Sequence, residues 1–153
     1  ENAERANAVV DAIRSSGGSA TALAADITDG VEVEAMMQYI TAHFGRLDAL
    51  ILNASGGLEI GADPGYAMRL NRDAQRRLAQ LAMPLMPAGS RIVFVTSHQA
   101  HFYPHKAVAK GYGRVAASKR AGETATKIVN AAVTPSLSTI VYAGAADYLM
   151  TVA

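Results

Sequence analysis

Two short, continuously apolar runs, at residues 49–52 and 92–95, constrain the fold of this chain more than any other feature. Strands with one face in water alternate apolar and polar residues, whereas strands covered by helices on both faces of a parallel sheet are apolar throughout. Between the runs, apolar residues recur at helical spacing from Leu70 to Leu85, and Pro87 and Gly89 follow. The pattern predicts an α/β protein with a three-layer, doubly wound parallel sheet.

Helix and turn signals divide the N-terminal part of the chain. A helix capped by Asn2 is predicted to run through Ile13, and residues 21–25 are predicted to form a strand. Asp29 is expected to cap the next helix and Gly45 to end it. The predicted apolar face of that helix consists of Val33, Met36, Met37, Ile40 and Phe44.

The order of these elements bears on domain organisation. With 153 residues the chain has room for one core, so we predict a single domain over residues 1–153. A doubly wound domain is expected to begin with a strand, yet this chain opens on a helix, so the first strand-helix-strand unit is predicted to be missing. The helix carrying Lys119 continues without a turn signal, and we predict a discontinuity near residues 124–125. Residues 139–144 are predicted to form the last strand.

Composition excludes several classes of partner. The net charge of +1 comes from 14 basic and 13 acidic residues that are scattered along the chain, so no nucleic-acid partner is expected. The apolar runs are far shorter than the roughly 20 residues that span a bilayer. With no membrane segment and no visible signal peptide, we expect a cytoplasmic protein. The absence of cysteine excludes disulfides and thiolate zinc sites.

The candidate site residues are those that directly follow the predicted strands. In an open α/β sheet, ligands bind outside the carboxyl ends of the strands. Small residues there allow a ring or a ribose to approach the backbone closely. The alternative is that they are ordinary turn residues. The candidates are Asp26, Ile27, Asn53, Ala54, Ser55, Gly56, Thr96 and Ser97.

Residues 44–57, Phe-Gly-Arg-Leu-Asp-Ala-Leu-Ile-Leu-Asn-Ala-Ser-Gly-Gly, carry a family resemblance. They are similar to the Phe-Gly, Asp, apolar strand and Asn-Ala-Gly pattern of short-chain dehydrogenases/reductases, with Ser55 in place of the usual glycine. The resemblance implies a Rossmann-like fold with NAD or NADP as cofactor. It also implies hydride transfer to or from a small carbonyl or alcohol substrate, and a homodimer or homotetramer.

The resemblance also implies roles for single residues. Asp26 matches an acidic residue that contacts the adenine ring, and Asn71 an asparagine that holds a water of the proton relay. Ser97 matches the serine that hydrogen-bonds the substrate carbonyl. Lys119 matches the lysine that grips the nicotinamide ribose and tunes the proton donor. The implied cofactor-binding set is Asp26, Ile27, Asn53, Ala54, Ser55, Gly56, Thr96 and Lys119.

The chain departs from the family pattern at the proton donor. The family places tyrosine four residues before the lysine, where this chain has Val115. Tyr112 lies on the same helical stripe as Val115 and Lys119, but about 4.5 Å further along the axis. Tyr112 is predicted to replace the donor if Gly111 and Gly113 allow the helix to start late. Otherwise it marks a binding site without chemistry.

The remaining observations leave alternatives open. No Gly-x-x-x-Gly-x-Gly motif stands near the N-terminus to hold a pyrophosphate. Because valine transfers no proton, a non-catalytic dinucleotide-binding or sensing protein is the rival function, and a flavin-binding, flavodoxin-like module is a third. Tyr103 is a weaker candidate donor. No metal site is predicted, and the histidines after residue 97 are expected to line the substrate pocket; they are His98, His101 and His105.

Overall fold

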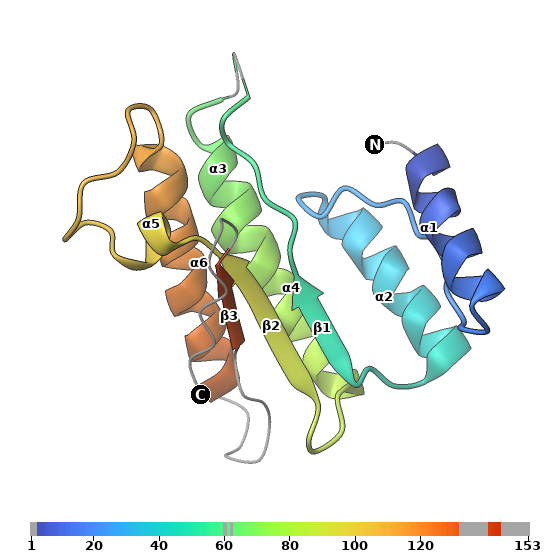
Figure 1. The fold of residues 1–153 in the computed structure, drawn as a ribbon. Helices are drawn as coiled ribbons and strands as arrows, with labels where there is room; N and C mark the ends of the chain where they lie inside the picture. The colour runs from blue at the N-terminus through green and yellow to red at the C-terminus, as the bar shows by residue number, and fades with distance from the viewer. Residues whose placement is uncertain (1–2, 60, 62, 132–140, 145–153) are drawn as a thin grey trace.

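Three parallel strands form the sheet of this protein. The computed structural model describes residues 3–59, 61, 63–131 and 141–144. The strands are β1 (Ala49–Leu52), β2 (Arg91–Thr96) and β3 (Val141–Gly144), and they pair in the order β1-β2-β3. Helices connect each parallel pair (Figure 1). The predicted parallel α/β fold is therefore confirmed.

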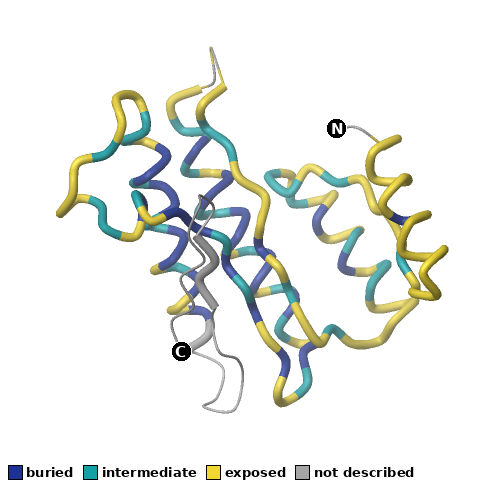
Figure 2. Tube along the Cα trace, viewed as in Figure 1, coloured by how far each residue is buried: buried dark blue, intermediate teal, exposed yellow. Residues whose placement is uncertain are grey.

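One face of the sheet is packed against a layer of helices. The helices α4 (Gln75–Ala82) and α6 (Gly113–Ala131) cover this face, and α2 (Gly30–Phe44) packs beside α4 near the β1 edge (Figure 1). The core between them consists of Val33, Met37, Leu52, Leu78, Ala79, Ala82, Met86, Ile92, Phe94 and Val129. Figure 2 shows buried residues along this layer, whereas α1 (Ala3–Ser15) is almost entirely exposed.

The opposite face of β1 differs from the prediction. The apolar run at residues 49–52 was expected to be covered on both faces, but Ile51 is 57% exposed. Its neighbour in register, Val93, is only half-buried. Among the described residues no helix packs on that face. One face of the apolar strand β1 is therefore left exposed.

The ends of α2 lie where the sequence predicts them. The Asp29 carboxylate caps the helix by accepting from the backbone N–H of Val31 at 2.7 Å. Gly45 ends it with a φ of 67°, in the left-handed region that favours glycine. Phe44 is exposed rather than part of the buried face, and its ring lies edge-on to that of Tyr39. The predicted cap Asn2 lies outside the described residues.

The predicted strand at residues 21–25 is wrong. This segment forms neither helix nor strand and belongs to no sheet. A strand exists only where a neighbouring backbone satisfies its N–H and C=O groups. In the described part of the chain β1 pairs only with β2, so no strand lies beside residues 21–25.

The predicted helix between the two strands is present, with an irregular middle. Helix α3 (Tyr66–Met68) passes into a π-helical segment, η1 (Arg69–Ala74), then into α4 and a short 3₁₀ turn, η2 (Met83–Leu85). The π turn carries Asn71, which the sequence assigns to the site. Such segments occur mostly as single-turn insertions, often at functional sites.

The C-terminal half completes the frame of the site. The short helix α5 (His98–His101) follows β2, and α6 then runs unbroken through residues 124–125. The predicted single domain and the predicted discontinuity at 124–125 stay predictions. A continuous helix does not show whether the residues on its two sides are adjacent in the natural protein. The last predicted strand is present as β3, and residues 139–140 lie outside the described part. Over the described residues, no helix combines the length and apolarity needed to cross a bilayer.

Candidate functional site

The hydroxyl groups of Ser97 and Tyr112 form a hydrogen bond. Their oxygens lie 3.0 Å apart, and either can be the donor. Ser97 follows β2 and caps α5, where its Oγ also accepts from the backbone N–H of Ala100 at 3.2 Å. The structure thus brings the predicted carbonyl-binding serine and the substitute donor together at the carboxyl end of β2.

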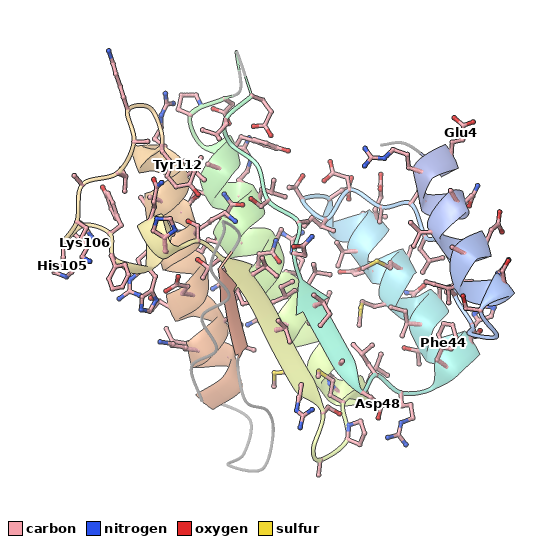
Figure 3. All side chains as sticks on the ribbon, viewed as in Figure 1. Glu4, Phe44, Asp48, His105, Lys106 and Tyr112 are labelled. Atoms are coloured by element: carbon pink, nitrogen blue, oxygen red, sulfur yellow. The ribbon has the colours of Figure 1, made fainter. Side chains whose placement is uncertain are left out.

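The position of Tyr112 follows from how α6 begins. Gly111 has a φ of 85°, and the helix starts at Gly113, directly after Tyr112. The Tyr112 carbonyl accepts from the N–H of Ala116 at 2.9 Å, so Tyr112 is the N-cap residue of α6. Figure 3 shows Tyr112 at this end of the helix, on the side of α5. The late helix start that the donor hypothesis required is therefore present.

Val115, in the family's tyrosine position, is a packing residue. Its side chain is only 3% exposed. A Cβ added to Gly57 would lie 3.3 Å from the Val115 methyl group and closer still to Ala67. Val115 therefore fills the space between α3 and the loop after β1, and the hydroxyl of the site comes from the turn before it.

Asn71 connects the loop after β1 to α6. Its amide nitrogen donates to the Gly56 carbonyl and to Ser118 Oγ, both at 2.9 Å, and its side-chain oxygen accepts from the Gly56 N–H at 3.3 Å. Ser118 directly precedes Lys119. The side chain of Asn71 is thus used within the chain, and its role in holding a water stays a prediction.

Lys119 is a buried cation with spare donors. It is 6% exposed, and within the described part of the chain its ammonium donates no hydrogen bond. Desolvation lowers the pKa of Lys119 below the ordinary lysine value, while the nearby Glu123 carboxylate acts in the opposite direction. An ammonium in this position fits a ligand that offers several acceptors, such as a ribose diol.

The predicted adenine-binding residue, Asp26, is held in a local turn. Its Oδ1 accepts from both the backbone N–H and the hydroxyl of Thr28 at 2.8 Å, and these bonds lower the pKa of Asp26. The carboxylate is exposed and has a second oxygen for a ligand. Ile27 differs, because its side chain packs against the core.

The loop after β1 is open to solvent. Asn53, Ala54 and Ser55 are exposed, as close approach of a ligand requires. The Ala54 carbonyl accepts from Gln75 Nε2 at 2.7 Å, and this bond ties the loop to the start of α4. Thr96 is buried and donates its hydroxyl to Glu123, so a ligand contact of Thr96 is left to its backbone.

Glu123 is a site-adjacent residue that the sequence analysis missed. It is 1% exposed and accepts hydrogen bonds from Thr96 Oγ1 and from Arg120 Nη1, both at 2.7 Å. His101 Nδ1 lies 3.4 Å from the same carboxylate. Glu123 is four residues after Lys119 and therefore on the same helical face, and this spacing is the signal that could have identified Glu123.

The histidines do not act as a group. His101 faces Glu123, whereas His105 and Lys106 lie on the outer loop between α5 and α6, away from the sheet (Figure 3). In the described ranges, no three His, Cys, Asp or Glu side chains are arranged to hold a metal ion. A cleft of about 300 Å³ is lined by residues such as Leu58, Gly111 and Arg114, and its lining includes neither Ser97 nor Tyr112.

The chain is similar to known proteins in sequence and in fold. The model of the short chain dehydrogenase family matches residues 1–143. A probable tetrahydroxynaphthalene reductase of Zymoseptoria tritici is 36% identical over 129 residues, which are 79% of this chain and 46% of that protein. A 7alpha-hydroxysteroid dehydrogenase of Escherichia coli K12 is 37% identical over 106 residues, or 65% of this chain and 42% of that protein. The chain therefore spans less than half the length of these curated relatives.

Solved structures show the same fold. A short-chain dehydrogenase/reductase from Serratia marcescens has a TM-score of 0.80 at 29% identity, with 94% of this chain and 60% of that one covered. A short chain dehydrogenase from Burkholderia cenocepacia in complex with NADP has a TM-score of 0.79 at 31% identity, with 93% and 59% covered.

Proposed function

Because the chain belongs to the short-chain dehydrogenase family, we propose that the whole protein is an NAD(P)-dependent oxidoreductase in which Tyr112 is the proton donor. The 3.0 Å contact between Ser97 Oγ and Tyr112 Oη carries this proposal. A carbonyl oxygen that accepts from both hydroxyls would be held by Ser97 and protonated by Tyr112.

The reaction follows from these two groups. When bound, the nicotinamide supplies the hydride that forms the new C–H bond at the carbonyl carbon. The Tyr112 hydroxyl gives its proton to the carbonyl oxygen, which becomes the alcohol, and Tyr112 is then reprotonated from solvent. Ser97 keeps the oxygen in place during the transfer. In the oxidative direction the same groups act in reverse order.

The residues at the carboxyl ends of the strands support a dinucleotide as the cofactor. Lys119 has unused donors for ribose hydroxyls, and Asp26 presents an exposed carboxylate oxygen at the adenine position. The open loop from Asn53 to Ser55 lies between these positions in the sequence. The neighbour from Burkholderia cenocepacia is in complex with NADP, which supports NADP or NAD here. The glycine-rich turn for the pyrophosphate is not within this sequence.

The decisive experiment measures NADH and NADPH oxidation by the whole protein. Substrates would include simple ketones, 3-oxoacyl thioesters, polyhydroxynaphthalenes and a keto steroid, the last two because of the relatives' names. Turnover with one of them is the expected result. Tight cofactor binding without turnover of any carbonyl would contradict the proposal.

A non-catalytic dinucleotide sensor is the second candidate, and Val115 favours it. The usual donor position holds a buried side chain that transfers no proton. This candidate predicts NAD(P)H binding that Tyr112→Phe leaves unchanged and no carbonyl reduction. Binding of flavin in preference to nicotinamide would favour the third, flavodoxin-like alternative.

We also propose that the protein acts in the cytoplasm as a homodimer or homotetramer on a small carbonyl or alcohol. Support comes from the family, whose members use the helices that correspond to α4 and α6 for dimer packing. The exposed Ile128 on α6 is consistent with such an interface. Light scattering of the purified whole protein tests the oligomeric state, and a monomer at micromolar concentration would contradict it.

A further inference from the structure

The carboxylate of Glu123 has no part in the proposed proton transfer, yet it is buried, accepts two hydrogen bonds and lies beside His101. Burying a carboxylate costs desolvation free energy unless charged and hydrogen-bonding partners surround it. Glu123 has a partner on each of three elements: Thr96 on β2, His101 on α5 and Arg120 on α6. Such a residue connects the elements that supply its partners.

Each partner of Glu123 lies close in sequence to a residue of the proposed site. Thr96 directly precedes Ser97, and its hydroxyl is 2.7 Å from Glu123 Oε1. His101 donates its backbone N–H to the Ser97 carbonyl at 2.9 Å. Arg120 directly follows Lys119 on α6, the helix that begins beside Tyr112. Through Thr96 and His101 the carboxylate therefore links α6 to the two elements that flank Ser97.

Close packing around Glu123 leaves little room for adjustment. Gly122, its neighbour on α6, approaches the Asn71 carbonyl and the Phe94 ring so closely that a Cβ would overlap both. Ser97 and Tyr112 lie on different elements and share only one hydrogen bond. Their separation therefore depends on how β2 and α5 sit against α6.

We propose that Glu123 is a positioning residue: from α6 it bonds Thr96 on β2 and faces His101 on α5, and so fixes the distance between the Ser97 and Tyr112 hydroxyls. This inference rests on the proposed function, in which the distance between the two hydroxyls matters for proton transfer to the substrate. Displacement of a reacting group by about 1 Å can cost about 100-fold in rate, so a loosened link should reduce kcat more than cofactor binding.

The test uses Thr96→Val in the whole protein, because valine keeps the shape and removes only the hydroxyl that bonds Glu123. Thr126→Val is the matched control: Thr126 is also buried, and among the described residues its hydroxyl bonds only the Gly122 carbonyl of its own helix. We expect Thr96→Val to lower kcat by about tenfold or more, with the cofactor KM within about twofold of wild type. Thr126→Val should leave kcat unchanged.

A double-mutant cycle shows whether Thr96 acts through the carboxylate. In a Glu123→Ala background, Thr96→Val should have no further effect on kcat, because the link is already broken. Glu123→Gln keeps an oxygen that can accept from Thr96 and should recover part of the activity that Glu123→Ala loses. Additive losses, wild-type kcat in Thr96→Val, or equal losses in Thr96→Val and Thr126→Val would each overturn the inference.

Hydrogen exchange separates this inference from the proposed function. The backbone N–H groups of Ala100 and His101 should exchange faster in Thr96→Val than in wild type or Thr126→Val, whether or not a substrate is turned over. If wild type reduces no carbonyl, the proposed function is wrong and the exchange rates alone decide about Glu123. Unchanged exchange in Thr96→Val would overturn the positioning role in either case.

Discussion

Ser97 Oγ lies 3.0 Å from Tyr112 Oη, although the two residues follow different elements and are separated by the whole of α5 and the loop after it. This contact gives the site a pair of hydroxyls in the absence of a tyrosine at position 115. It also makes the proposed chemistry open to direct tests.

Replacing Tyr112 by phenylalanine removes the proposed proton donor and keeps the ring. We expect kcat for carbonyl reduction to fall by about 10²- to 10⁴-fold, the usual contribution of a general acid. Cofactor binding, followed by NADPH fluorescence, should stay within about twofold of wild type. Tyr103→Phe, in the loop after α5, is the control. Unchanged reduction by Tyr112→Phe, or a larger loss in Tyr103→Phe, would show that Tyr112 is not the donor.

The buried ammonium of Lys119 makes stability depend on pH. Desolvation lowers the pKa of Lys119, so between that lowered value and the ordinary lysine value near 10.5 the unfolded state binds more protons. The free energy of unfolding contributed by Lys119 therefore rises with pH across this window. Lys119→Met should be more stable than wild type at neutral pH, and the difference should shrink as pH rises.

Urea unfolding at a series of alkaline pH values measures this difference. Lys110→Met, at an exposed position beside the cleft, is the control for loss of a lysine charge. If the free energies of unfolding of wild type and Lys119→Met differ by a constant amount from neutral to alkaline pH, the lowered pKa of Lys119 is contradicted. Lys119→Met should also weaken NADPH binding, because the ribose loses its proposed partner.

Gly122 is required where α6 crosses the π-helical segment η1. An added methyl group would overlap the Asn71 carbonyl oxygen and the Phe94 ring. Gly122→Ala should lower the free energy of unfolding by about 1–3 kcal/mol, as overpacking does in other cores. Gly113→Ala is the matched control, because nothing lies within 4 Å of the added atom there. Equal midpoints of denaturant unfolding for the two variants would contradict the close approach.

The Asp29 cap is expected to stabilise α2. Asp29→Ala removes the acceptor of the Val31 and Glu32 N–H groups and should cost about 1 kcal/mol of unfolding free energy. Glu34→Ala, an exposed change within the same helix, should alter it by less than about 0.5 kcal/mol. Thermal or urea unfolding measures both. A similar effect of the two changes would mean that the cap contributes little.

Local sequence determined the elements whose signals lie within a few residues. Asp29 and Gly45 bound α2 because a carboxylate cap and a left-handed glycine act on the adjacent backbone. The apolar runs became β1 and β2 because no polar side chain interrupts them. The order of Asp26, Asn71, Ser97 and Lys119 along the chain predicted the family, since a family pattern is itself a property of sequence.

Only the tertiary structure decided the rest, because it depends on what lies beside a residue in space. Residues 21–25 were predicted to form a strand, but they form none without a neighbouring strand to bond. The sequence left open whether Tyr112 could reach the site; the late start of α6 and the turn at Gly111 bring it to Ser97. The sequence did not predict the burial of Glu123, which results from its contacts with residues of β2, α5 and α6. Contacts between distant segments require the packed fold, which no local signal specifies.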